Sequence, residues 1–206
     1  MQRLVGSHAQ LLDDAVRAKG VLQPGEQLMW VSPRAADNWA EYRDGEFLEQ
    51  IGHPELSPAL ATFWPRGGPQ WDALGRGDAG TVLLVEAKAH LSELASTCTA
   101  SPQSRARIEH SLEETKRALG ARADADWLTG YYQYANRLAH LHFLRALHVP
   151  AILIFLYFTN DQRMNGPISC DGWSEGLRAV YAHLGLPPDV PIPHVTNVYL
   201  DTRELA

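Results

Sequence analysis

The stretch Thr81-Val82-Leu83-Leu84-Val85-Glu86-Ala87-Lys88 decides how the chain folds. Its first five residues are leucine or β-branched and follow a glycine-containing turn, which is typical of a strand buried on both faces of a sheet. The apolar run 150–158 has the same character. Helical segments alternate with these runs along the chain. The sequence therefore predicts an α/β fold in which a central mixed sheet is flanked by helices.

The helical segments are recognised by apolar residues that recur every three or four positions. This spacing predicts helices over 7–19, 35–51, parts of 91–119, 127–148 and 173–184. A last strand is expected over 195–200. Because no repeat or linker divides the sequence, residues 1–206 are expected to form a single domain, with about the first 34 residues as a helical extension.

The amino-acid composition limits the classes of protein to which the chain can belong. Of the 206 residues, 45% are hydrophobic and 20% are charged, as in an ordinary globular protein. No apolar run reaches the roughly 18 to 20 residues that a membrane-spanning helix needs, and the first residues lack the layout of a secretory signal. Cys98 and Cys170 are too far apart for a CxxC metal motif. We therefore expect a cytoplasmic protein with no membrane partner, and the sequence allows a homodimer.

The net charge of −6 argues against a nucleic-acid partner, because proteins that bind phosphate backbones usually present a basic surface. The segment 105–122 would offset this if its basic residues shared one face of a helix. A solvated helix face is the more common origin of such a run. The basic residues of the segment are Arg105, Arg107, Lys116, Arg117 and Arg122.

Glu86 and Lys88 are the informative charged pair. Residues two apart in a strand point to the same face, so a carboxylate and an ammonium stand side by side at the end of an interior strand. Desolvation is costly for both groups and must be compensated. An ion pair between them would do so. A divalent cation on Glu86 would also do so, and would leave Lys88 free to act on a reacting group.

Asp72 precedes Glu86 by an intervening segment of 13 residues that contains a glycine-rich turn. The two segments can form an antiparallel hairpin, which places Asp72 near Glu86. Two converging carboxylates repel each other unless a cation lies between them. Mg²⁺ is suited to this position because it prefers oxygen ligands and is usually held by one or two carboxylates. Mn²⁺ is an alternative.

The string Pro69-Gln70-Trp71-Asp72, followed by Glu86-Ala87-Lys88, resembles the PD-(D/E)XK motif of the restriction-endonuclease-like superfamily. The resemblance implies a restriction-endonuclease-like core and a Mg²⁺-dependent nuclease that hydrolyses phosphodiester bonds, in DNA rather than RNA. It implies Asp72, Glu86 and Lys88 as catalytic residues, with Lys88 serving the nucleophilic water. The implied metal ligands are Asp72, Glu86 and the backbone carbonyl of Ala87. Pro69 departs from the pattern, since two residues separate it from Asp72.

Four accessory residues follow from the same resemblance or from position. Members of the superfamily often carry an acid on the helix before the motif, and Glu41 and Glu49 are both candidates. Gln133 resembles a helix glutamine found near the metal in some of these nucleases. His90 would share the side of Lys88 if the strand continued, although a capping or packing role is the alternative. The helix face that would either line the cleft or face solvent consists of Gln133, Asn136, Arg137 and His140.

Two other functions fit the same residues. A catalytically inactive restriction-endonuclease-like protein, acting as a binding or scaffold module, would agree with the negative net charge. A small-molecule enzyme would use Glu86 and Lys88 as an acid–base pair without metal. Titration with Mg²⁺ or Mn²⁺ separates the first from an active nuclease. The second predicts activity that survives a chelator.

Overall fold

The computed structural model describes residues 1–187 and 190–205. Their strands form a five-stranded mixed sheet in the order β1-β2-β3-β4-β5. The pairs β1–β2 and β2–β3 are antiparallel, and β3–β4 and β4–β5 are parallel. The predicted α/β class and mixed sheet are therefore confirmed. The strands are β1 Leu28–Ser32, β2 Ala73–Gly77, β3 Val82–Lys88, β4 Ala151–Thr159 and β5 Val195–Asp201.

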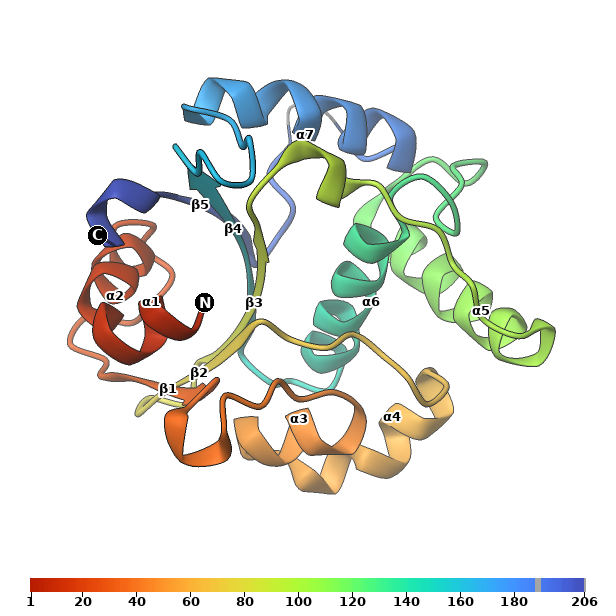
Figure 1. The fold of residues 1–206 in the computed structure, drawn as a ribbon. Coiled ribbons are helices and arrows are strands. Elements are labelled where there is room, and N and C mark those ends of the chain that lie inside the picture. The colour runs from red at the N-terminus through yellow and green to blue at the C-terminus, as the bar shows by residue number, and fades with distance from the viewer. Residues whose placement is uncertain (188–189, 206) are drawn as a thin grey trace.

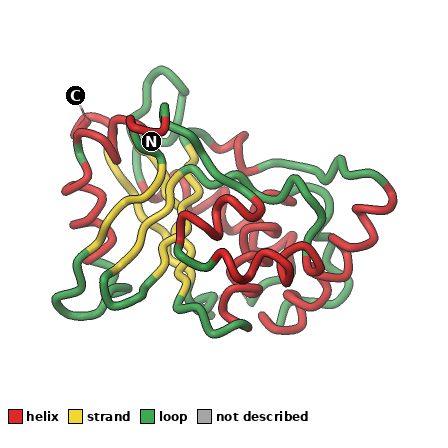
Figure 2. Tube along the Cα trace, turned by 90° about the horizontal axis from the view of Figure 1, so that it is seen from below, coloured by secondary structure: helices red, strands yellow, loops and turns green. Residues whose placement is uncertain are grey.

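Helices cover both faces of the sheet (Figure 1). The first two lie on one face, and the others lie on the opposite side. There α3 is near β1 and β2, α4 packs against α3 and α5, α6 packs along β4, and α7 is at the β5 end. Figure 2 shows the strands grouped beside this larger helical layer. The helices are α1 Gln2–Ser7, α2 Ala9–Arg17, α3 Asp44–Ile51, α4 Ser57–Phe63, α5 Pro102–Leu119, α6 Tyr132–Ala146 and α7 Cys170–Leu184. Single 3₁₀ turns span Ala35–Asp37, Pro54–Leu56, Leu91–Leu94 and Thr202–Leu205.

Strand β3 lies between two hydrophobic cores. Val82 and Leu84 belong to the core on the α6 side, whereas Leu83 and Val85 belong to the core beneath α1 and α2. Burial on both faces explains the unbroken apolar run, because neither set of side chains meets water. Glu86 continues the series of Val82 and Leu84. Its side chain is therefore directed to the layer that contains α6.

Some elements differ from the sequence prediction. Residues 28–32 form the edge strand β1, so the first 34 residues are not a purely helical extension. Over 35–51 only Asp44–Ile51 forms an α-helix. Asn38 and Trp39 have φ values of 53° and 60°, and this left-handed backbone interrupts a right-handed helix. The glycine-rich turn expected before β3 starts only after Gly77, because β2 extends to that residue.

Gly77 is required by a buried carboxylate beside β2. Glu26 is 2% exposed and accepts hydrogen bonds from the backbone N–H of Gln23, at 2.9 Å, and from the N–H and hydroxyl of Thr81, at 3.1 and 3.0 Å. A Cβ atom on residue 77 would lie 1.8 Å from Glu26 Oε1. The carboxylate can keep these donors only if residue 77 has no side chain.

We expect Gly77→Ala to lower the free energy of unfolding by about 2–3 kcal/mol, because the displaced carboxylate loses charge-assisted hydrogen bonds. Urea unfolding followed by circular dichroism measures the change. Gly45→Ala is the control: its Cβ would meet only Ser57 Oγ, at 3.3 Å, and alanine favours the helix α3. Equal stability of Gly77→Ala and the wild type would contradict the assignment of Glu26 as a structural acceptor.

Candidate active site

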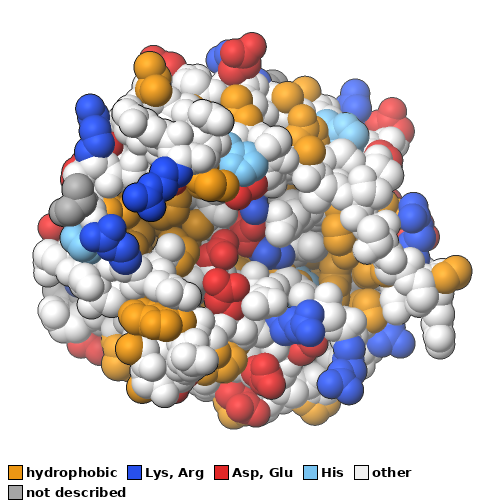
Figure 3. Space-filling model, in the orientation of Figure 1, with side chains coloured by type: hydrophobic (Ala, Val, Ile, Leu, Met, Phe, Trp, Pro, Cys, Tyr) orange, Lys and Arg blue, Asp and Glu red, His pale blue; other side chains and the backbone are white. Residues whose placement is uncertain are grey.

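A cleft with a volume of about 710 Å³ lies at the carboxyl end of β3. The last three residues of β3 line it, together with Asp72, the loop 67–70 and the first turns of α6. In the space-filling view this face is hollowed near its centre, where acidic side chains gather beside basic ones (Figure 3). The structure thus brings the predicted residues Asp72, Glu86 and Lys88 to one cleft.

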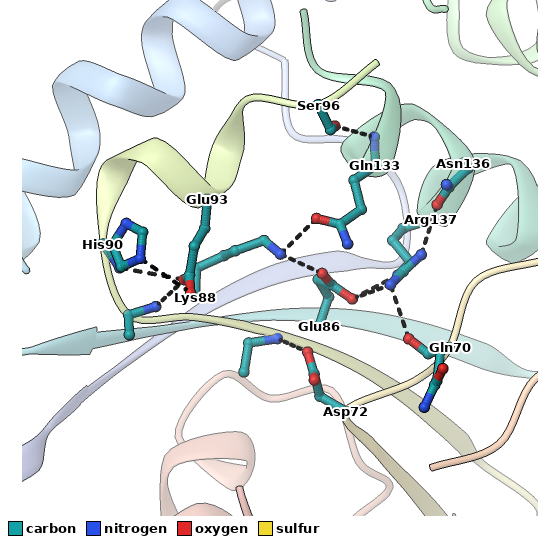
Figure 4. A network of polar contacts seen from close by, with 12 residues as sticks. Gln70, Asp72, Glu86, Lys88, His90, Glu93, Ser96, Gln133, Asn136 and Arg137 are labelled. Carbon is teal, nitrogen blue, oxygen red and sulfur yellow. Dashed lines mark hydrogen bonds and ion pairs between the residues drawn. The ribbon is translucent and has the colours of Figure 1, made fainter. Parts of the chain in front are cut away.

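Both carboxylate oxygens of Glu86 are engaged by cations (Figure 4). Oε1 lies 2.5 Å from Lys88 Nζ, and Oε2 accepts a hydrogen bond from Arg137 Nε at 2.7 Å and pairs with Arg137 Nη2 at 2.5 Å. The Glu86 side chain is 3% exposed and that of Arg137 is 4% exposed. Charges so deeply buried are tolerated only when they are paired. The ion pair with Lys88, one of the two alternatives considered from the sequence, is therefore present, and Arg137 extends it.

Lys88 is held by two partners. Besides Glu86, its ammonium donates a hydrogen bond to Gln133 Oε1 at 2.8 Å. The backbone N–H of Gln133 in turn donates to Ser96 Oγ at 2.7 Å, which fixes the start of α6 beside the strand end. Gln133 thus lies in the cleft, where it holds the Lys88 ammonium.

Asp72 directly precedes β2 and lies next to the end of β3, as the predicted hairpin requires. Its Oδ2 accepts a hydrogen bond from the backbone N–H of Ala87 at 2.7 Å. Burial, together with the negative charge of Glu86, raises the pKa of Asp72 from 3.8 to about 6. The two carboxylates therefore repel each other, and ionising Asp72 in the folded protein costs free energy.

Arg137 was predicted only as a member of a polar helix face, and its partners are the main addition from the structure. Its Nη1 donates to Asn136 Oδ1 at 2.8 Å, and its Nη2 donates to the backbone carbonyl of Gln70 at 2.9 Å. The guanidinium carbon lies 5.1 Å from the centroid of the Trp71 ring, within the range of a cation–π contact. Arg137 therefore links β3, α6 and the loop before β2.

The predicted helix face divides between the cleft and the core. Gln133, Asn136 and Arg137 line the cleft, whereas His140 is 1% exposed and packs against the rings of Trp64 and other aromatic residues. Burial lowers the pKa of His140 from 6.5 to about 3. The alternative of a solvent-exposed polar face is thus wrong for this helix.

The other accessory candidates have separate positions. Glu41 lines the cleft, where its Oε2 accepts from Gln70 Nε2 at 3.2 Å, but it belongs to an irregular segment and not to a helix. Glu49 is exposed on α3 and is absent from the cleft lining. His90 caps the 3₁₀ turn at 91–94, which is the alternative role considered for it. Glu93 completes that cap by accepting from the backbone N–H of His90 at 3.4 Å, and it also accepts from that of Ala89 at 2.6 Å. It adds an unpredicted carboxylate to the cleft.

Among the basic residues of 105–122, Lys116 is withdrawn from the surface and so cannot belong to the basic patch considered from the sequence. Lys116 is 4% exposed and donates to backbone carbonyls, including that of Ala125 at 3.0 Å. Arg107 donates to the carbonyl of Ala61 at 2.8 Å, at the end of α4. Arg105 pairs with Glu109 along the helix. Arg105, Arg107, Arg117 and Arg122 are exposed or partly exposed, so a basic surface formed by them stays a prediction.

The donor set at the end of β3 can be compared with what a metal requires. Within residues 1–187 and 190–205, no three side chains of His, Cys, Asp or Glu gather as a metal site. The cleft instead offers the carboxylates of Asp72 and Glu86, with the carbonyl of Ala87 on the same strand end. Two carboxylates supplemented by a carbonyl and water suit Mg²⁺, which rarely has an all-protein shell. The residues present therefore fit this ion.

In the part of the chain that the structure describes, no helix is long and apolar enough to cross a membrane. Comparison with known proteins finds no matching family model, no matching curated protein and no matching solved structure.

Proposed function

We propose that the chain is a metal-dependent nuclease with a restriction-endonuclease-like core, which hydrolyses phosphodiester bonds in nucleic acid, with DNA as the first substrate to test. The observation that supports this most is the meeting of Asp72, Glu86 and Lys88 in one cleft at the end of β3. The antiparallel hairpin β2–β3 followed by parallel β4 agrees with the resemblance read from the motif.

Each residue has a role in this proposal. Asp72, Glu86 and the carbonyl of Ala87 would hold Mg²⁺ or Mn²⁺, and such an ion supplies polarisation of a phosphoryl oxygen and a lowered pKa of bound water. Lys88 orients the attacking water or stabilises developing charge. Gln133 keeps the Lys88 ammonium in place through its Oε1.

The inactive binding or scaffold module remains the second candidate because of one observation. Both oxygens of Glu86 are already satisfied by Lys88 and Arg137. In an inactive protein this network would be a permanent structural element. In an active nuclease the metal must instead compete with these two cations for Glu86.

The test is cleavage of single-stranded DNA, double-stranded DNA and RNA with Mg²⁺ or Mn²⁺. We expect cleavage that a chelator abolishes, and a loss of at least about a hundredfold in Lys88→Met, as for removal of one charge-stabilising group at an active site. Lys88→Met leaves the Glu86–Arg137 pair intact, so the fold is retained. Lys19→Met, at an exposed lysine after α2, is the matched control. Full activity in Lys88→Met, or no cleavage of any substrate by the wild type, would overturn the proposal.

A further inference from the structure

Four charged side chains meet at the base of the cleft. Asp72 and Glu86 contribute two negative charges, and Lys88 and Arg137 contribute two positive charges, so the group is neutral when all four are ionised. A divalent cation that enters this group alone would face two buried cations. Its binding is favourable only if a cation moves away from Glu86 or an anion arrives with it.

Arg137 is the cation that can exchange its partner without losing its other contacts. Its guanidinium is anchored by Asn136 Oδ1 and by the carbonyl of Gln70, and these contacts do not depend on Glu86. A guanidinium carries five N–H donors, and its planar fork matches a phosphate as well as a carboxylate. Lys88 and Arg137 are the lysine and arginine residues that line the described cleft. Since Lys88 is assigned to the water, Arg137 remains to contact the substrate phosphate.

We propose that Arg137 is an exchangeable phosphate clamp, which holds Glu86 in the free protein and transfers to a phosphodiester oxygen when Glu86 takes up the metal. Metal and phosphodiester then bind cooperatively. Binding of the metal to Glu86 frees Arg137 for the phosphodiester, and binding of the phosphodiester to Arg137 frees Glu86 for the metal. This inference rests on the proposed nuclease function and adds a coupling to it: each ligand strengthens the binding of the other.

The coupling is measured by calorimetric titration of Mn²⁺ into the wild-type protein, with and without saturating dimethyl phosphate, a phosphodiester with no nucleoside. We expect dimethyl phosphate to tighten Mn²⁺ binding about tenfold, which lies within the usual range of coupling between two ligands. An Mn²⁺ affinity that does not change with dimethyl phosphate would overturn the clamp alone. Absence of Mn²⁺ binding under both conditions would overturn the nuclease proposal together with the clamp.

Two variants test whether the coupling between Mn²⁺ and dimethyl phosphate depends on the guanidinium of Arg137. Arg137→Gln removes one positive charge, so Mn²⁺ alone should bind about tenfold more tightly and dimethyl phosphate should no longer improve binding. Arg122→Gln is the control, because it also removes one positive charge, but at an exposed residue outside the cleft; coupling should persist. An Arg137→Gln variant that folds and titrates like the wild type would overturn the proposal. If it does not fold, Arg137→Lys, which keeps the charge and loses the fork, should bind Mn²⁺ weakly and show reduced coupling.

Discussion

Replacement of Asp72 by asparagine is expected to abolish metal-dependent cleavage and, at the same time, to make the metal-free protein more stable at neutral pH. The pKa of Asp72 rises from 3.8 to about 6 on folding, through burial and the charge of Glu86. Between these values the folded state holds more protons than the unfolded state, so stability falls as pH rises. The ionised carboxyl therefore costs stability above pH 6. Asparagine removes this cost and can still accept the hydrogen bond from Ala87.

We expect a gain of about 1–3 kcal/mol in the free energy of unfolding at pH 7.5 in the presence of a chelator. The gain should shrink as pH falls below 6 and vanish below 3.8, where the wild-type carboxyl is protonated in both states. Denaturant unfolding across this pH range measures it. Glu41→Gln, at a second carboxylate of the cleft, is the control and should show no such gain. A destabilised Asp72→Asn variant at neutral pH would contradict the prediction.

Replacement of Glu86 by alanine is expected to abolish cleavage and to destabilise the protein by about 3–5 kcal/mol, the usual cost of breaking a buried ion pair. Without Glu86, the ammonium of Lys88 and the guanidinium of Arg137 are left close together with no anion between them. The two proposed metal ligands should thus change stability in opposite directions, although both changes remove activity. Thermal and urea unfolding of the two variants, in the same metal-free buffer, gives the comparison.

Glu86→Gln refines this comparison, because glutamine keeps an oxygen acceptor for one cation and loses the charge. Its stability should lie between those of the wild type and Glu86→Ala, and its cleavage activity should be lost. The distances indicate that the network of Glu86, Lys88 and Arg137 stabilises the end of β3. A Glu86→Ala variant as stable as the wild type would contradict this conclusion.

The central strands could be predicted because their residues are buried on both sides, and such strands appear in the sequence as unbroken apolar runs. This holds for β3 and β4. The edge strand β1 was missed, because its five residues follow a Pro-Gly turn and gain their conformation from pairing with β2. Pairing between distant segments has no local signal in a sequence.

The same reasoning separates the site residues that were predicted from those that were missed. Asp72, Glu86 and Lys88 follow from strand periodicity and a hairpin, which are local. The role of Arg137 depends on how α6 is oriented, and α6 packs between β4 and α5. Because it is covered on two sides, nearly all of its residues from Tyr134 to Leu144 are buried, and its polar residues do not mark a solvent face. Glu93 was not predicted because its position depends on His90, three residues earlier, acting as the N-cap of the 3₁₀ turn. Histidine is an unusual residue at an N-cap, so the sequence does not signal this turn.

The double burial of β3 has a consequence for the chemistry. A slip of one residue in the pairing of this strand would exchange its two faces. Glu86 and Lys88 would then enter the apolar layer beneath α1 and α2, while Val85 and Ala87 would occupy the cleft. Both hydrophobic layers oppose this exchange, because it would bury charged side chains. Helices α1 and α2 do not line the cleft, yet their packing helps to determine the face of the sheet on which Glu86 and Lys88 lie. Changes in the α1–α2 layer are therefore a route by which distant substitutions alter the alignment of Glu86 and Lys88.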